Sequence, residues 1–200
     1  RYPDHPRRAV LVFKLADASR QLGVSIGDEL HKQMPSAERA RLSEDRQNRH
    51  RSAMKMYQQV IDAVNARPAR MLTDLDKLLR RNAMFYLGDC ALELGDQPLA
   101  IKLYDAAAQA YASDPASLVA RVQIVRAYVE QGRWAEAMTA NERAKRQLAA
   151  LPEGAMEDPN LPMQRRHWEK WLESDALLQQ RRQAQGGGGN GGAGRGGRED

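Results

Sequence analysis

Apolar residues recur at helical spacing along most of the chain, and two short segments interrupt the pattern in the same way. In each segment a glycine closes one apolar stretch and a second stretch opens shortly after it: Gly95-Asp96-Gln97-Pro98-Leu99-Ala100 and Gly132-Arg133-Trp134-Ala135-Glu136-Ala137. The two glycines lie 37 residues apart, a spacing typical of stacked helical repeats. The pattern predicts helical hairpins that bury their apolar faces by stacking on one another, as in an α-solenoid.

Start and stop signals give the limits of the predicted helices. The first runs from Pro6 to Leu22 and ends at Gly23, and an irregular loop continues to Pro35. A long helix then runs from Ser36 to about Ala66. The later predicted helices span 73–94, 96–112, 114–131, 133–150 and 162–182. The first predicted helix is apolar on both sides, which predicts a neighbour on each side, including a preceding repeat.

Composition agrees with an all-helical chain that ends in a tail. The sequence has only two Phe and three Trp, and nine of its 15 glycines fall within Gly186–Gly197. Such a tail cannot bury enough apolar surface to become ordered. We therefore predict a repeat domain over residues 1–182 and a disordered Gly/Arg tail over residues 183–200.

Three sets of residues resemble the tetratricopeptide repeat family. The middle set is Met84, Leu87, Gly88, Ala91, Gly95, Ala100, Tyr104 and Ala107. The third set is Arg121, Ile124, Val125, Tyr128, Gly132, Ala137, Asn141 and Ala144. The first set is Val12, Leu15, Ala16, Ser19 and Gly23, followed by Ala53, Tyr57 and Val60. The resemblance implies an all-α solenoid of about three repeats, with an insertion at about residues 24–52 and a C-terminal capping helix at 162–182.

The beginning of the chain bears a second, shorter resemblance. Residues 2–7 and the sequence Leu15-Ala16-Asp17 are similar to repeat junctions in bacterial envelope proteins of this family. This resemblance implies a bacterial protein associated with the cell envelope. The compartment itself stays open between the bacterial cytoplasm and the periplasm or cell envelope. No targeting segment is visible in the sequence, and no apolar run reaches the roughly 18 residues that a membrane-spanning helix needs.

The sequence contains no recognisable catalytic motif. It lacks G-x-S-x-G, HExxH and a phosphate loop ending in Gly-Lys-Ser/Thr, and its four histidines are scattered without metal-ligand spacing. The single cysteine, Cys90, lies among apolar residues and is predicted to be a small buried side chain. We predict no catalytic residue, no cofactor and no metal site.

The family resemblance implies a concave groove lined by the first helix of each hairpin, which binds a peptide or a helix of another protein. The corresponding positions are Phe13, Asp17, Arg20, Asn82, Phe85, Asp89, Glu93, Val122, Arg126 and Glu130. Their mixed charge suits a partner that is itself of mixed charge. A plain solvated helix surface is the alternative interpretation of each position.

Two alternatives to a protein-binding scaffold stay open. The net charge is +5, and a nucleic acid or an anionic surface is a second class of partner. It would bind an arginine-rich stretch and the Gly/Arg tail. The basic residues of that stretch are Arg39, Arg41, Arg46, Arg49, Arg51 and Lys55. Three acids interleave with them, at Glu38, Glu44 and Asp45, which argues against nucleic acid. The other alternative is that the chain is the non-catalytic C-terminal end of a larger multidomain enzyme.

Overall fold

A computed structural model describes residues 7–156 and 163–173, and within them every regular element is helical. The α-helices are α1 (Arg8–Glu29), α2 (Ser36–Asn65), α3 (Asp74–Glu93), α4 (Gln97–Ala110), α5 (Ala116–Glu130), α6 (Trp134–Ala150) and α7 (Arg165–Glu173). The short 3-10 helices are η1 (Ala69–Met71) and η2 (Glu153–Met156). None of the helices in this part of the chain is long and apolar enough to cross a membrane.

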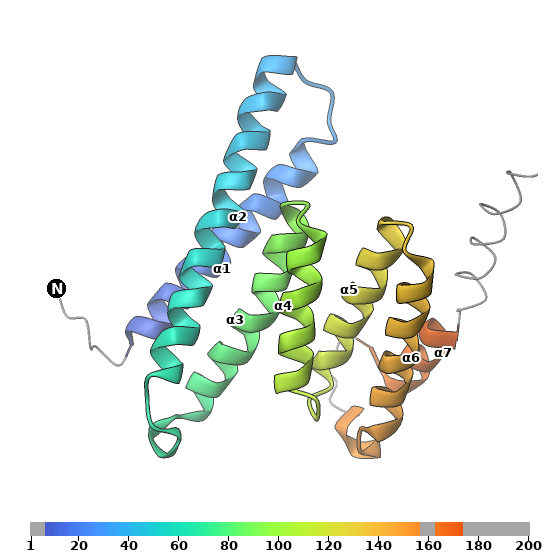
Figure 1. Cartoon of the computed structure of the whole chain (residues 1–200). Coiled ribbons are helices and arrows are strands. Elements are labelled where there is room, and N and C mark those ends of the chain that lie inside the picture. Colours follow the sequence, from blue (N-terminus) through green and yellow to red (C-terminus); the bar gives the residue numbers. More distant parts are fainter. Residues whose placement is uncertain (1–6, 157–162, 174–200) are drawn as a thin grey trace, which may run out of the picture.

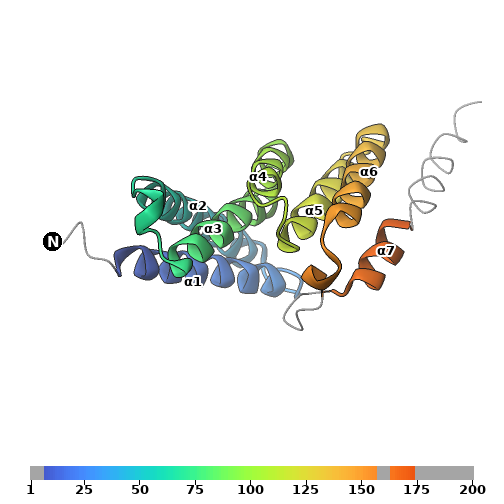
Figure 2. The same ribbon diagram turned by 90° about the horizontal axis from the view of Figure 1, so that it is seen from below.

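The helices stack as three antiparallel hairpins, α1–α2, α3–α4 and α5–α6, followed by α7 (Figure 1). Seen from below, α1, α3, α5 and α7 form one layer and α2, α4 and α6 form the other (Figure 2). We call the first set the first helices and the second set the second helices. The predicted all-α solenoid of three hairpins with a C-terminal capping helix is confirmed. The predicted tail and the end of the last predicted helix lie outside the described residues.

The turns at Gly95 and Gly132 have the same geometry. Both glycines have positive φ angles, 77° and 68°, which a residue without Cβ adopts at no steric cost. The amide of Asp96 donates to the carbonyl of Ala91 at 3.0 Å, and that of Arg133 donates to Tyr128 at 2.9 Å. These bonds satisfy carbonyls that a helix end leaves without partners. The repeated sequence segment is therefore a repeated helix stop.

Helices α3 and α4 begin where the sequence predicts. The Thr73 hydroxyl accepts a hydrogen bond from the amide of Asp76, whose carboxylate accepts one from the amide of Thr73, so the two form a capping box. Asp96 caps α4 by accepting from the amide of Leu99 at 3.0 Å. These side chains satisfy amides that have no partner inside the helix.

The predicted end of the first helix at Gly23 is wrong. Helix α1 continues through Gly23 to Glu29, and the irregular loop shortens to residues 30–35. A Cβ on Gly23 would lie 2.6 Å from Nε2 of His50 in α2. The glycine therefore allows close helix packing and does not act as a stop signal. Residues 24–52, interpreted from sequence as an insertion, form the outer end of a long α1–α2 hairpin (Figure 1).

Three apolar clusters hold the stack together. The first joins α1, α2 and α3 around Tyr57, the second joins α3 to α6 around Tyr104, and the third joins α5, α6 and α7 around Trp168. Cys90 is fully buried in the first cluster, as predicted, and burial raises the pKa of its thiol to about 12. The sulfur is thus a packing atom and stays protonated at neutral pH.

Candidate functional site

Three predicted groove residues of α1 are held by contacts inside the protein. Arg20 forms an ion pair with Asp17 at 2.7 Å, and its Nε donates to the hydroxyl of Tyr57 in α2 at 3.3 Å. Its guanidinium carbon lies 4.3 Å from the ring centroid of Tyr86 in α3. The ring of Phe13 packs edge-on against Tyr57, with centroids 5.6 Å apart. These contacts tie α1 to both neighbouring helices.

The charge state of this cluster follows from its burial. Burial by itself would lower the pKa of Arg20, but its hydrogen bonds to Asp17 and Tyr57 raise that pKa above the ordinary value. Burial raises the pKa of Tyr57, so the phenol stays neutral and donates to Asp17. The cluster is a polar network whose hydrogen bonds are satisfied within the protein: the charged Arg20 donates to the charged Asp17.

Two predicted residues near the end of α3 also have internal partners. Asp89 accepts a hydrogen bond of 2.6 Å from the hydroxyl of Tyr104 in α4, and burial raises the pKa of its carboxyl. Glu93 forms an ion pair with Arg46 of α2. Both carboxylates therefore join α3 to a second helix.

The middle of α3 presents Asn82 and Phe85, which are both half-buried. The amide oxygen of Asn82 accepts from Nε of Arg81 at 3.1 Å. The ring of Phe85 lies 6.1 Å, centroid to centroid, from that of Tyr111. Each side chain keeps part of its surface accessible to a partner.

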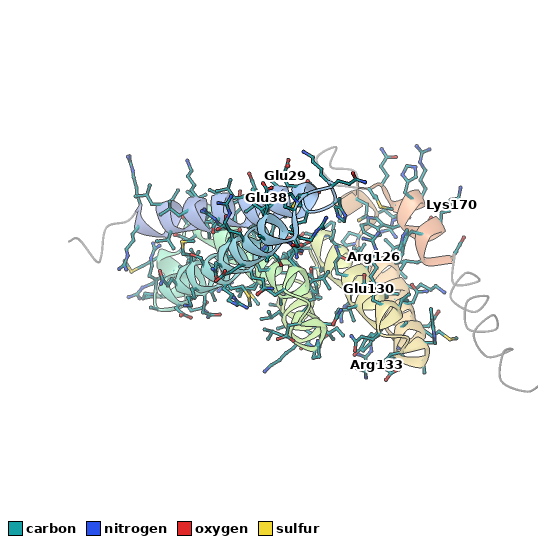
Figure 3. All side chains as sticks on the ribbon, turned by 90° about the horizontal axis from the view of Figure 1, so that it is seen from above. Glu29, Glu38, Arg126, Glu130, Arg133 and Lys170 are labelled. Atoms are coloured by element: carbon teal, nitrogen blue, oxygen red, sulfur yellow. The ribbon has the colours of Figure 1, made fainter. Side chains whose placement is uncertain are left out.

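The predicted residues of α5 differ among themselves in exposure. Val122 is only 6% exposed and packs in the third cluster, against α6 and α7. Arg126 and Glu130 are exposed, and the guanidinium carbon of Arg126 lies 6.0 Å from the ring centroid of Trp171 in α7. In the view of Figure 3 the two charged side chains lie between the tip of the α1–α2 hairpin and Lys170 of α7.

A cleft that the sequence analysis missed lies on the other side of the stack, between α4, α5 and α6. Its volume is about 400 Å³, and we call it the outer cleft. Ile101, Ile124 and Tyr128 supply its apolar lining, with Lys102 of α4 and Arg143 of α6 beside them. The sequence gives no signal for it, because its walls come from three helices whose spacing is set only by packing.

Most of the arginine-rich stretch is engaged within the protein. Arg39 donates to the carbonyls of Leu30 and Lys32, and Arg46 pairs with Glu93. Arg49 pairs with Asp45 at 3.2 Å, and Arg51 donates to Gln47 at 2.9 Å. Arg39 thus joins α2 to residues 30–32 before it, and Arg46 joins α2 to α3. Over residues 7–156 and 163–173, no three His, Cys, Asp or Glu side chains are grouped so that they would hold a metal ion.

Comparison with known proteins identifies one of the repeats. The tetratricopeptide repeat family matches residues 82–114, which comprise most of α3, the Gly95 turn, α4 and the start of the next connection. The second of the three hairpins thus matches the tetratricopeptide repeat. The resemblance to bacterial envelope proteins stays a prediction.

Two chains among the solved structures match this one. One of them is a 14-3-3 protein from Cryptosporidium parvum, 17% identical, with a TM-score of 0.42; the similarity covers 85% of this chain and 89% of that chain. No curated protein sequence matches the chain.

Proposed function

We propose that this protein is a non-catalytic interaction scaffold, which binds a peptide or a helix of another protein on the face formed by its first helices. The tetratricopeptide repeat at residues 82–114 supports the class of function, since such solenoids present extended binding surfaces. Binding would rest on complementary shape and charge, and no bond would be made or broken.

The observation that carries this proposal is that Arg126 and Glu130 are exposed charges without an ion-pair partner in the described part of the chain. They lie one turn apart on α5, carry opposite charges and are both exposed. No ion pair in the described part of the chain engages either side chain, whereas Asp17, Arg20 and Glu93 have partners inside the protein. Arg126 and Glu130 can therefore bind a partner's charges at a small desolvation cost.

The internal contacts of the other predicted groove residues also favour binding on the first-helix face. The Arg20 network and the Tyr104–Asp89 bond hold α1, α3 and α4 in fixed relative positions. A surface that is already ordered loses little conformational entropy when it binds, which favours affinity. Asn82 and Phe85 would extend the contact surface along α3. Val122 is buried, so it would support the first-helix face by packing in the core and would not touch the partner.

A selection experiment with matched variants tests the proposal. Peptides would be selected from a displayed random library on the purified chain, and their affinities measured by calorimetry. We expect Arg126→Ala with Glu130→Ala to weaken binding at least about tenfold, which corresponds to about 1.4 kcal/mol. The control, Lys102→Ala with Arg143→Ala, removes two charges from the outer cleft and should leave the affinity unchanged.

The opposite results would reject the assignment. If the α5 double variant binds as well as the wild type, the first-helix face is not the site. A loss confined to the control variant would place binding in the outer cleft. A selection that yields no binding peptide would reject peptide recognition altogether.

A further inference from the structure

Helix α1 carries an apolar stripe on its outer side. Leu11, Leu15 and Leu22 are 60%, 62% and 50% exposed, and Ala18 between them is exposed as well. Their spacing of four, three and four residues places all of them on one face of the helix. Large apolar side chains that are this exposed and this regularly aligned mark an interaction surface.

Three of the four corresponding positions in α3 are buried under the preceding hairpin. When the repeats are placed in register, with Leu15 on Leu87 and Gly23 on Gly95, Leu22 falls on the half-buried Leu94. The other members of the stripe, Leu11, Leu15 and Ala18, fall on Ala83, Leu87 and Cys90. These three side chains are 0%, 5% and 0% exposed, and they pack in the cluster that contains Tyr57 and Val60 of α2.

Helix α5 repeats the arrangement. In the same register Leu22 corresponds to the half-buried Gln131. The other three members of the stripe correspond to Ala120, Ile124 and Ala127, which are all buried. Ala120 and Ile124 pack in the cluster that contains Tyr104 of α4. Both later hairpins therefore use this face to receive the helix that precedes them, and on α1 the same face is apolar but bears no other described helix (Figure 1).

The charges at the two ends of α1 indicate what covers the stripe. The helix begins with Arg8 and ends with Glu29, whose exposed carboxylate also pairs with Lys32 at 2.7 Å. The helix that packs on this face of α3 or α5 runs antiparallel to α3 or α5. We therefore expect the helix that covers the same face of α1 to run antiparallel to α1. A second copy of α1, related by a two-fold axis between Ala18 and Ser19, meets this requirement. It places Leu15 opposite Leu22 and Arg8 opposite Glu29 of the other copy, so the surface is complementary to itself.

We propose that the stripe formed by Leu11, Leu15, Ala18 and Leu22 is a homodimer interface, in which two α1 helices pack antiparallel about a two-fold axis. This surface is separate from the first-helix face of the proposed function. Phe13 and Arg20 lie on another side of α1, where they contact Tyr57 and Tyr86. The dimer proposal and the peptide-binding proposal can therefore be rejected independently of each other.

Sedimentation velocity and light scattering on the whole chain, over a range of micromolar concentrations, test the interface. The wild type should sediment as a dimer. Leu15→Lys should raise the dissociation constant at least about tenfold, because it puts a charge at the centre of an apolar contact. The matched control Leu75→Lys alters an exposed leucine of α3, which is 50% exposed against 62% for Leu15, and should remain dimeric. Circular dichroism would verify that both variants keep their helical content.

A charge exchange provides the second arm. Arg8→Glu alone should weaken the dimer by placing like charges at both ends of the interface, and adding Glu29→Arg should restore it. A wild type that is monomeric at every concentration would overturn the proposal, and so would a Leu15→Lys variant that stays dimeric. If the wild type is monomeric but binds a synthetic peptide copying residues 50–65 of α2, the face receives a repeat helix and the second copy is excluded.

Discussion

The hydroxyl of Tyr104 in α4 donates a hydrogen bond of 2.6 Å to the carboxylate of Asp89 in α3. Tyr104 is 1% exposed, and burial raises the pKa of both groups, so the phenol remains a neutral donor. The bond joins the two helices of the central hairpin beneath the first-helix face. A residue predicted to line the groove therefore has a structural partner.

Tyr104→Phe should destabilise the protein by about 1–3 kcal/mol, because it leaves the Asp89 carboxylate without its hydrogen-bond donor in a poorly hydrated place. Urea unfolding followed by circular dichroism would measure the change. Tyr111→Phe is the matched control: its hydroxyl accepts from Nε of Arg80 at 3.0 Å, but the residue is only half-buried. Water can replace the lost bond there, and the cost should be smaller. Equal losses in the two variants would contradict the role given to Asp89.

Gly23→Ala should cost about 1–3 kcal/mol of stability, as overpacking in a core does. The added Cβ would lie 2.6 Å from Nε2 of His50, so α1 and α2 must separate. Gly154→Ala, where no atom lies within 4 Å of the added Cβ, should be close to neutral. The double variant Gly23→Ala with His50→Ala should lose less than the sum of its single variants, because the clash is removed. Full additivity in thermal unfolding would show that the two residues do not oppose each other.

Stability should decrease as the pH falls below about 6.5, in part because of His50. Its ring is fully buried, and neither nitrogen has a hydrogen-bond partner in the described part of the chain. Burial lowers its pKa; the nearby Arg46 and Arg20 add to this effect and Glu93 opposes it. The unfolded chain therefore takes up a proton at a higher pH than the folded protein. This contribution to stability is complete above the unfolded pKa and is lost as the pH falls towards the folded pKa.

Urea unfolding at a series of pH values would measure this effect. His50→Leu removes the titrating ring and should flatten the pH dependence below about 6.5. His31→Gln alters an exposed histidine and serves as the control, with a curve like that of the wild type. An unchanged slope in His50→Leu would assign the acid sensitivity to other groups.

Nucleic acid should not bind at physiological salt. Arg39, Arg46, Arg49 and Arg51 have partners within the protein, and carboxylates neutralise two of them, Arg46 and Arg49. Fluorescence anisotropy with labelled single-stranded RNA and duplex DNA would test this expectation. Tight binding that weakens steeply with added salt would favour the nucleic-acid alternative. If the double variant Arg41→Glu with Lys55→Glu then binds nucleic acid more weakly, the nucleic-acid site lies on α2.

The sequence by itself determined where helices begin and end in the hairpins α3–α4 and α5–α6. The capping box at Thr73, the Asp96 cap and the positive-φ glycines Gly95 and Gly132 depend on contacts within a few residues of chain. Such local signals fix where helices begin and end. The sequence also placed Cys90 correctly in the core, since the apolar residues beside it lie on the same helix.

Only the tertiary structure decided what the remaining signals mean. Gly23 resembles a helix stop in sequence, yet it lies inside α1, because the ring of His50, distant in sequence, needs the space. Arg20 and Asp89 resemble exposed groove residues, but their partners Tyr57 and Tyr104 approach from other helices. The exposure of Leu15 is likewise a property of the stack: the same position is buried in α3 and uncovered in α1. A side chain's neighbours across helices depend on packing, and no pattern along a single helix specifies them.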